Sequence, residues 1–421
     1  MNPAGRLTPA RRPLTEFLAA AVLVAAVVFN AVLAVVNAQL KSLTPELVIV
    51  CELLIVVAAH AIALLHFRAR MTPWYALIAV MAAFAVFRSA ALGYVEVKYF
   101  RDVLLIPTFI VLGMTYPRER LPRLLVLLQL LILAGMVLEA GWLDTYASLF
   151  DIKTYYINTR GYTDQDFWNT GSTLFVSASR PDDRFFSFVD FHRMSSVFLE
   201  PVSLGNYCII IAAYVFASYR TLTVWQRIIL LGGTAVLIVG CDGRLAAVSC
   251  LIIAVTSLFA TWAPRRFVIV LPLAVLIAAI AAVLFFGFRA GPDDFSGRIA
   301  HTVALLRDYG LPEFLGVSDV YLSKAVDSGL AYLITTQSLF GTLVLWLFIA
   351  LFAAERTRQE VVFKTAAALY LSLSMLVSFS FLSIKTAALL WFILGAMQSG
   401  RVTLSAVSWS RMRSPALAPN R

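Results

Sequence analysis

Twelve apolar runs divide this chain, and each is a candidate helix for crossing a bilayer, which takes about 20 predominantly apolar residues. They lie at about 15–37, 46–66, 73–93, 103–116, 121–141, 201–219, 227–240, 245–263, 267–288, 328–354, 361–381 and 386–399, and the fourth and seventh are short. A soluble chain of 421 residues could not cover this apolar surface, because 61% of its residues are hydrophobic and only 14% are charged. We therefore expect an all-α polytopic membrane protein with about twelve transmembrane helices.

Basic residues indicate the orientation, because loops rich in Lys and Arg stay on the cytoplasmic side. With the N-terminus inside, the segments on that side hold 19 Lys and Arg residues: RLTPARR, HFRAR, YPRERLPR, RTLTVWQR, PRRF, ERTRQEVVFK and the tail from Arg401. The short connections outside hold five, namely Lys41, Lys98, Arg101, Arg244 and Lys385. We expect both termini in the cytoplasm. The net charge of +10 then reflects these loops and contact with membrane lipid, not nucleic-acid binding.

Two long segments fall on the external side. The chain then divides into helices one to five (1–143), a first loop (144–200), helices six to nine (201–288), a second loop (289–327), and helices ten to twelve with a basic tail (328–421). Loops of this length in a compact protein are usually functional or disordered, and these hold too many aromatic and aliphatic residues for disorder. The stretch TVALLRDYG in the second loop predicts a short helix.

Four external residues are candidates for chemistry: Arg193, Arg244, Arg298 and Asp327. Arginine suits phosphate because its guanidinium is always charged and offers a planar fork of donors. Three such side chains together would bind a diphosphate, and the CDGR turn before a helix predicts additional backbone N–H donors for an anion. The alternative is that these arginines reach lipid headgroups from the interface. Asp327 fits either a general base or the N-cap of the tenth span.

Supporting positions are predicted mainly for structural roles. Glu200 precedes Pro201, the expected first residue of a helix, so it favours the helix dipole or forms a salt bridge with Arg193. His301 is a weaker candidate for proton transfer, and no His–carboxylate spacing marks a metal site. Two charges inside spans, Glu52 and Arg88, are predicted to pair with each other. The four cysteines have neither disulfide nor zinc spacing and are predicted to be small core residues.

Four stretches resemble the O-antigen polymerase and O-antigen ligase superfamily. RMSSVFLEPVSLGNY resembles its Arg–small–small–Phe–x–Glu–Pro–x–x–x–Gly stretch, and LIVGCDGRLAAV resembles its Ser–Arg–small stretch, with Asp242 and Gly243 where a serine or threonine often stands. FSGRIAHTVALLRDYGLPEFLGVS resembles its Gly–Arg segment with a following Pro–x–x–Gly turn. DSGLAYLITTQSLFG resembles its His/Asp–small–x–Leu segment, with aspartate where the ligases carry histidine. The matches follow the family's order over about residues 190–345.

The resemblance implies a membrane glycosyltransferase of the GT-C type in the bacterial inner membrane. Such an enzyme takes a glycan from undecaprenyl diphosphate at the periplasmic face, without metal or cofactor. Carried over, Arg193, Arg244 and Arg298 bind the diphosphate, Asp327 activates the acceptor hydroxyl, and Glu200 and His301 support them. The aspartate favours a polymerase of exopolysaccharide or O-antigen repeat units, which works beside a flippase and a chain-length regulator.

Two alternatives remain open. One is a ligase that transfers the glycan to a lipid or protein acceptor. The other is a transporter or flippase of lipid-linked sugars, which should place ionisable groups near the midplane among broken helices and inverted repeats. The sequence shows no internal repeat and places its notable charges at the external edge. Aromatic residues of the first loop are candidates for stacking on sugars, with local packing as the alternative: Tyr155, Tyr156, Tyr162, Phe167 and Trp168.

Overall fold

The computed structural model describes residues 11–167, 171–178, 184–188, 191–260, 262, 266–291 and 294–399, and the regular elements in these ranges are helical. The α-helices are α1 (Arg11–Val27), α2 (Phe29–Gln39), α3 (Pro45–Leu65), α4 (Thr72–Leu92), α5 (Val97–Gly113), α6 (Leu121–Gly141), α7 (Leu143–Phe150), α8 (Ile152–Arg160), α9 (Pro201–Ser218), α10 (Val224–Arg227), α11 (Gly233–Cys241), α12 (Arg244–Phe259), α13 (Phe267–Phe286), α14 (Phe295–Asp308), α15 (Leu311–Phe314), α16 (Gly329–Phe352), α17 (Arg358–Met375) and α18 (Ile384–Met397). A π-helical turn, η6 (Ile228–Gly232), joins α10 to α11. The short helix predicted in the second loop is α14.

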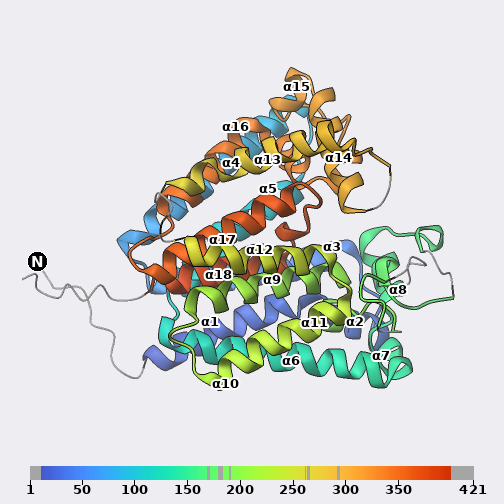
Figure 1. The fold of residues 1–421 in the computed structure, drawn as a ribbon, viewed down its shortest axis with the longest axis vertical. Helices are drawn as coiled ribbons and strands as arrows, with labels where there is room; N and C mark the ends of the chain where they lie inside the picture. The colour runs from blue at the N-terminus through green and yellow to red at the C-terminus, as the bar shows by residue number, and fades with distance from the viewer. Residues whose placement is uncertain are drawn as a thin grey trace, which may run out of the picture.

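The long helices form one bundle with two distinct ends (Figure 1). At the loop end, α7, α8, α14 and α15 gather, so both predicted loops lie on the same side of the bundle. At the opposite end, here called the N-terminal end, α1, α4 and α6 begin and α3 and α18 finish. Contacts fix this arrangement: Thr15 Oγ1 lies 3.0 Å from His66 Nε2, and Arg70 donates to the carbonyl of Gln398 at 2.6 Å.

The centre of the bundle is built on α9 and α18. Every residue of α18 is buried, and so is nearly every residue of α9. The second half of α5 lies directly against α18, because Gly113 and Gly395 have no side chains there. A Cβ on Gly113 would clash with the carbonyl oxygen of Phe392, and one on Gly395 would clash with that of Ile110. Small residues that let helix backbones approach closely are typical of packing inside membranes.

Among the described residues, seven helical segments are long and apolar enough to cross a membrane: Pro45–Leu65, Ala69–Leu92, Arg118–Gly141, Pro201–Ser218, Val224–Cys241, Phe267–Phe286 and Gly329–Phe352. The pair α1 and α2, bent by 63°, would be an eighth. This confirms the expected helical membrane protein but gives fewer full spans than the predicted twelve. The remaining apolar runs form α5, α12, α17 and α18, which are short or carry charges in their first turns.

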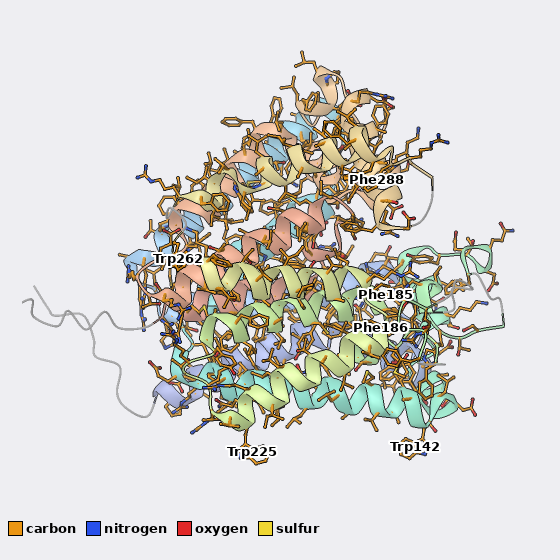
Figure 2. All side chains as sticks on the ribbon, viewed as in Figure 1. Trp142, Phe185, Phe186, Trp225, Trp262 and Phe288 are labelled. Atoms are coloured by element: carbon orange, nitrogen blue, oxygen red, sulfur yellow. The ribbon has the colours of Figure 1, made fainter. Side chains whose placement is uncertain are left out.

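Tryptophans mark both ends of the bundle. Trp142 stands at the loop end, and Trp225 and Trp262 stand at the N-terminal end (Figure 2). Their exposed fractions are 61%, 74% and 80%. Large aromatic side chains are enriched where a membrane meets water, because one part of the ring system is apolar and another is polar. Their placement agrees with a bundle that crosses a bilayer from one end to the other.

In the part of the chain that the structure describes, three spans are irregular along their length. The break between α1 and α2 is the first, and the π-helical turn η6 is the second. The third is Ser338 in α16, whose φ of 66° interrupts the helix. The half of α16 before Ser338 lies beside the start of α5, where Gln337 donates to the carbonyl of Tyr99 at 2.8 Å. Broken spans need other groups to satisfy the freed backbone, so they usually occur where helices are enclosed by protein.

The predicted orientation can be tested with single cysteines at the two ends. Asp308→Cys lies at the loop end, where the native side chain is 49% exposed, and Arg220→Cys lies at an exposed position of the N-terminal end. If the loop end is external, an impermeant thiol reagent should label Asp308→Cys in intact spheroplasts and label Arg220→Cys only after lysis. The parent protein, whose own cysteines are buried or half-buried, is the control. The reverse labelling pattern would invert the topology.

Candidate functional site

One buried carboxylate holds the motif RMSSVFLEP, together with His192 just before it, against helix α6. Glu139 accepts hydrogen bonds from the backbone N–H groups of Ser195 and Ser196 at 2.8 and 2.7 Å. The His192 ring lies 3.0 Å from its other carboxylate oxygen. Ser196 and Leu199 have left-handed φ angles of 51° and 61°, which cost about 1–3 kcal/mol each for residues with side chains. The bonds from α6 therefore hold the segment in a conformation that it would not adopt alone.

One predicted arginine bonds the connection between α11 and α12, and a second one follows it in the chain. Arg193 donates from Nε to the carbonyl of Cys241, the last residue of α11, at 3.3 Å, and from Nη1 to the carbonyl of Ser177 at 3.3 Å. Arg244 is the first residue of α12, and its side chain is exposed. Between them, Asp242 is buried and accepts two backbone N–H groups of the first loop at 3.2 and 3.1 Å. The carboxylate thus ties the first loop to this turn.

The turn does not offer the spare backbone N–H donors that the sequence predicted. The amide of Asp242 donates to Val239 at 3.3 Å, and that of Gly243 donates to Ile238 at 3.2 Å. The amide of Arg244 donates to the Asp242 carbonyl at 3.0 Å. These three donors are already used within the turn, so an anion bound here would depend on arginine side chains and on the later amides in the first turn of α12.

A second group forms around Asp327, the last residue of the 3₁₀ helix η7 (Lys324–Asp327). Nη1 of Arg298 lies 3.5 Å from Oδ1 of Asp327, and the two side chains are 31% and 57% exposed. The same guanidinium donates to the carbonyl of Val377 at 3.2 Å. His301, one turn further along α14, places Nε2 2.8 Å from the Lys324 carbonyl. The sequence-predicted Arg298, His301 and Asp327 therefore lie together, with the carboxylate open to solvent.

Asp327 does not cap α16, which was the structural alternative for this residue. The N-cap is Ser328, whose hydroxyl accepts the backbone N–H of Ala331 at 3.2 Å. Ser328 is completely buried, whereas Asp327 points outward. The carboxylate is therefore not needed to start the helix.

Asp294 caps the helix that carries Arg298. It caps α14 by accepting the N–H of Gly297 at 2.7 Å, and Ser296 donates to it at 2.8 Å. These hydrogen bonds, first that of Gly297, lower the pKa of the Asp294 carboxyl, and the positive charge of Arg244 lowers it further. Arg244 is thus within electrostatic reach of the N-terminus of α14, whose first turn carries Arg298.

Glu200 belongs to a different, buried group and does not pair with Arg193 as one sequence interpretation proposed. Its Oε2 lies 2.7 Å from Nζ of Lys385 in the first turn of α18, and Tyr156 donates to Oε1 at 2.5 Å. Burial alone would raise the pKa of the Glu200 carboxyl, but the charges of Lys385 and Arg160 outweigh it and lower that pKa to about 2. As predicted, Pro201 is the first residue of α9.

Lys385 is the most completely buried member of this group, with 1% of its side chain exposed. It also donates to the carbonyl of Phe198 at 3.0 Å, next to the left-handed residue Leu199. Its contacts join α18, α9 and the motif before α9. Glu200 and Lys385 are therefore positioning residues that hold the motif carrying Arg193.

Another ion-pair group joins α3, α5 and α16. Arg101 donates to Glu52 at 2.5 Å and to Asp102 at 2.8 Å, and Asp102 accepts the hydroxyl of Tyr332 at 2.7 Å. The predicted pairing of Glu52 with Arg88 is therefore wrong. Arg88 instead pairs with Asp319 of the second loop, which also accepts the hydroxyl of Tyr94.

Arg160, at the end of α8, is exposed and lies within electrostatic reach of both Glu200 and Glu52. It is a cation of the loop end that the sequence argument did not single out. Its position in the first loop, next to Gly161, was the available signal, but no motif distinguishes it from an ordinary loop arginine. Lys385 was missed because it was counted as a residue of a turn.

The aromatic residues of the first loop pack on one another. Tyr155, Tyr156 and Phe167 are buried, and the rings of Tyr156 and Phe175 lie 4.6 Å apart between centroids. Tyr162 contacts the same rings at about 6 Å. Trp168 lies outside the described residues. This arrangement supports local packing over sugar stacking for these rings.

No group of three or more His, Cys, Asp or Glu residues within the described ranges is arranged to hold a metal ion. The four cysteines are free, and Cys208 and Cys241 are buried, as expected of small core residues. Comparison of the chain with protein-family models, with curated proteins and with solved structures finds no match.

The Glu200–Lys385 ion pair should be essential for stability. Lys385→Met leaves the buried carboxylate without its cation, which typically costs about 3–5 kcal/mol. Replacing both partners, in Glu200→Gln/Lys385→Met, removes the uncompensated charge and should recover part of that loss. Thermal unfolding of the purified protein in one detergent measures both effects. A single variant as stable as the parent, or a double variant no better than the single, would contradict this role.

Proposed function

We propose that this protein is a membrane glycosyltransferase that joins undecaprenyl-diphosphate-linked oligosaccharide repeat units into an exopolysaccharide or O-antigen chain. In this proposal the chain has a GT-C-like fold, the twelve apolar runs all enter the membrane, and the loop end faces the periplasm of a bacterial inner membrane. A flippase and a chain-length regulator would be its partners.

The observation that carries the proposal is the pair of Arg298 and Asp327 at the loop end. A guanidinium and a carboxylate 3.5 Å apart, both open to solvent, offer one group for an anionic leaving group and one for a proton. The apolar helix α16 begins directly after Asp327, so the head of a lipid-linked donor and a water-borne hydroxyl can both reach this pair. Arg244, near the start of α14, adds a further exposed cation.

The chemistry requires few parts. A hydroxyl oxygen of the acceptor glycan attacks C1 of the donor sugar while the bond from C1 to the diphosphate oxygen breaks. The bonding electrons leave with the diphosphate, whose added charge is stabilised by Arg298, Arg244 and Arg193. Asp327 accepts the hydroxyl proton as general base. Attack opposite the leaving group inverts the configuration at C1.

Asp327 can act as the general base only if binding of the donor weakens its ion pair with Arg298. In the resting protein, Arg298 neutralises the carboxylate. When the diphosphate binds, the guanidinium can turn to the stronger anion, and Asp327 is then released to accept a proton. The bond of Arg298 to the Val377 carbonyl keeps the guanidinium near both positions. Arg298 would therefore couple donor binding to activation of the acceptor.

The three irregular spans favour a second candidate, a transporter or flippase of lipid-linked sugars. Transporters commonly bind substrate between broken helices near the midplane. However, the charged groups within spans lie near the loop end. Glu52 is seven residues from the start of α3 and Asp102 is five from the start of α5, which is about 10 Å or less at 1.5 Å per residue. This position favours transfer at a membrane surface.

Asp327→Asn separates proton transfer from structure. Ser328 caps α16, so asparagine should leave folding unchanged while removing the basic carboxylate. A general base typically contributes about 10²–10⁴-fold, so polymer formation should fall by that factor. Lipid-linked repeat units should accumulate, as seen by mass spectrometry of extracted lipids. Asp308→Asn, also at an exposed aspartate of the loop end, is the matched control. Polymer formation by Asp327→Asn at the parental rate would refute the assignment.

The arginines should depend on the shape of the guanidinium as well as its charge. Arg244→Lys and Arg298→Lys keep the charge but lose the planar fork, so each should reduce polymer yield by about tenfold or more at equal protein level. Arg307→Lys, in the same helix as Arg298 and 80% exposed, is the control and should remain active. If the lysine variants all match the parent, the arginines do not recognise a diphosphate.

A further inference from the structure

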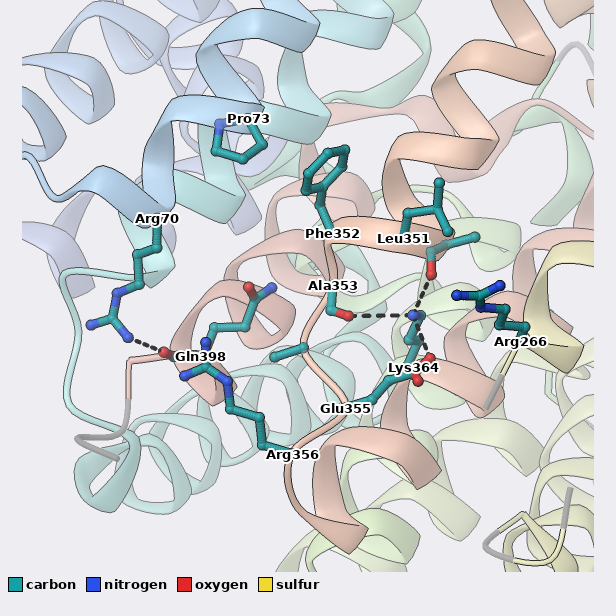
Figure 3. Close-up of a pocket in the computed structure, with 12 residues that line it drawn as sticks. Arg70, Pro73, Arg266, Leu351, Phe352, Ala353, Glu355, Arg356, Lys364 and Gln398 are labelled. Atoms are coloured by element: carbon teal, nitrogen blue, oxygen red, sulfur yellow. Dashed lines mark hydrogen bonds and ion pairs between the residues drawn. The ribbon is translucent and has the colours of Figure 1, made fainter. Parts of the chain in front are cut away.

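The N-terminal end of the bundle contains a cavity that the proposed reaction does not use. Its volume is about 480 Å³, and it lies under the link between α16 and α17. The start of α4 forms one side, the start of α13 another, and the end of α18 contributes Gln398 (Figure 3). The candidate active site lies at the other end of the bundle, so the cavity is not part of it.

Cations dominate the lining of this cavity. Arg70, Arg266, Arg356 and Lys364 line it, and Glu355 is the one carboxylate among the described lining residues. Lys364 already binds that carboxylate at 2.6 Å. The cavity therefore carries an excess of positive charge. Because like charges repel one another at short distance, an anion bound between them would lower the electrostatic energy of the cavity.

The charged side chains stand on a rigid frame. Nζ of Lys364, which is 3% exposed, donates to the carbonyls of Ala350 and Ala353 at 2.5 and 3.3 Å. The backbone N–H of Arg356 donates to Glu360 at 2.7 Å. Both ends of the link are thus fixed, while the side chain of Arg356 remains exposed. Arg70 is held by the carbonyls of Gln398 and Ser399 at the end of α18, at 2.6 and 3.3 Å.

The cavity is also open to apolar material. Leu351 and Phe352, which line it together with Pro73, are 55% and 45% exposed. Figure 3 shows Phe352 on the side of the cavity next to Pro73 and Leu351 above Lys364, with Arg266 beside Lys364 and Arg356 on the side of Gln398 and Arg70. Exposed apolar side chains beside arginines, at the end of a membrane bundle, match an amphiphile with a phosphate head and acyl chains. A purely soluble anion would not use the apolar side.

We propose that this cavity binds the phosphate of an anionic phospholipid, with Arg266 and Arg356 as the headgroup ligands. Basic pockets between membrane helices are suited to such headgroups. The phosphate of the bound lipid would lie among the arginines and so stabilise the link between α16 and α17. Lys364 and Glu360 already hold the two ends of this link against α17.

Native mass spectrometry of the full-length protein in neutral detergent tests this site. Short-chain phosphatidylglycerol is titrated in parallel with phosphatidylcholine of the same chain length. The parent should prefer phosphatidylglycerol. Arg266→Gln/Arg356→Gln should lose that preference, with affinity for the anionic lipid reduced by about fivefold for each arginine removed, the factor that corresponds to about 1 kcal/mol per basic side chain.

Arg220→Gln is the matched control, because Arg220 is exposed at the same end but does not line this cavity. It should retain the preference of the parent. A parent that binds both lipids equally, or an equal loss in all variants, would overturn the proposal. A further arm adds inorganic phosphate. If phosphate displaces phosphatidylglycerol from the parent at similar concentration, the site takes free phosphate, and the assignment to a lipid is wrong.

Discussion

The ion pair between Glu200 and Lys385 joins the two most deeply buried helices at the point where both begin. Glu200 precedes α9, and Lys385 lies in the first turn of α18. A charge placed among apolar helices is tolerated only when another charge and further hydrogen bonds compensate it. Tyr156 and Ser203 donate to the carboxylate, and Phe198 accepts from the ammonium. The position of the whole segment before α9 depends on this group, because the same lysine binds both the carboxylate and the strained backbone.

The same principle operates at neighbouring positions of the loop end. Glu139 binds the two serine amides of the motif, and Asp242 binds the amides of the first loop. In each case a buried carboxylate from a helix or a helix end holds an irregular backbone segment. The acidic residues of this end therefore serve mainly as anchors. Asp327 differs from them, because its side chain is largely exposed and its single ion pair reaches a side chain instead of backbone amides.

Periodicity and hydropathy predicted the helical class, the positions of the apolar helices and the helix in the second loop, because those depend on local composition. They did not predict where spans break. Ser338, with a φ of 66° and a ψ of 162°, and the 63° bend after α1 have no glycine or proline at those positions that would have signalled a break. The partners of the charged residues inside spans were also predicted wrongly, because those partners depend on the folded bundle. Glu52 and Arg88 lie in adjacent spans, yet each pairs with a residue that only the folded bundle brings near, Arg101 and Asp319.

At the candidate site, too, the sequence indicated individual residues, whereas only the fold shows which of them lie together. The sequence identified Arg298, His301 and Asp327 separately, and the fold brings them together because α14 folds back over η7. It did not identify Arg160, whose only distinction is its position near Glu200 and Glu52.

The two ends of the bundle also differ in their distribution of charge. At the loop end, carboxylates lie beside most of the buried cations. At the N-terminal end, arginines line a cavity whose one carboxylate among the described residues is already bound by Lys364, and the proposed lipid headgroup would balance the excess positive charge there.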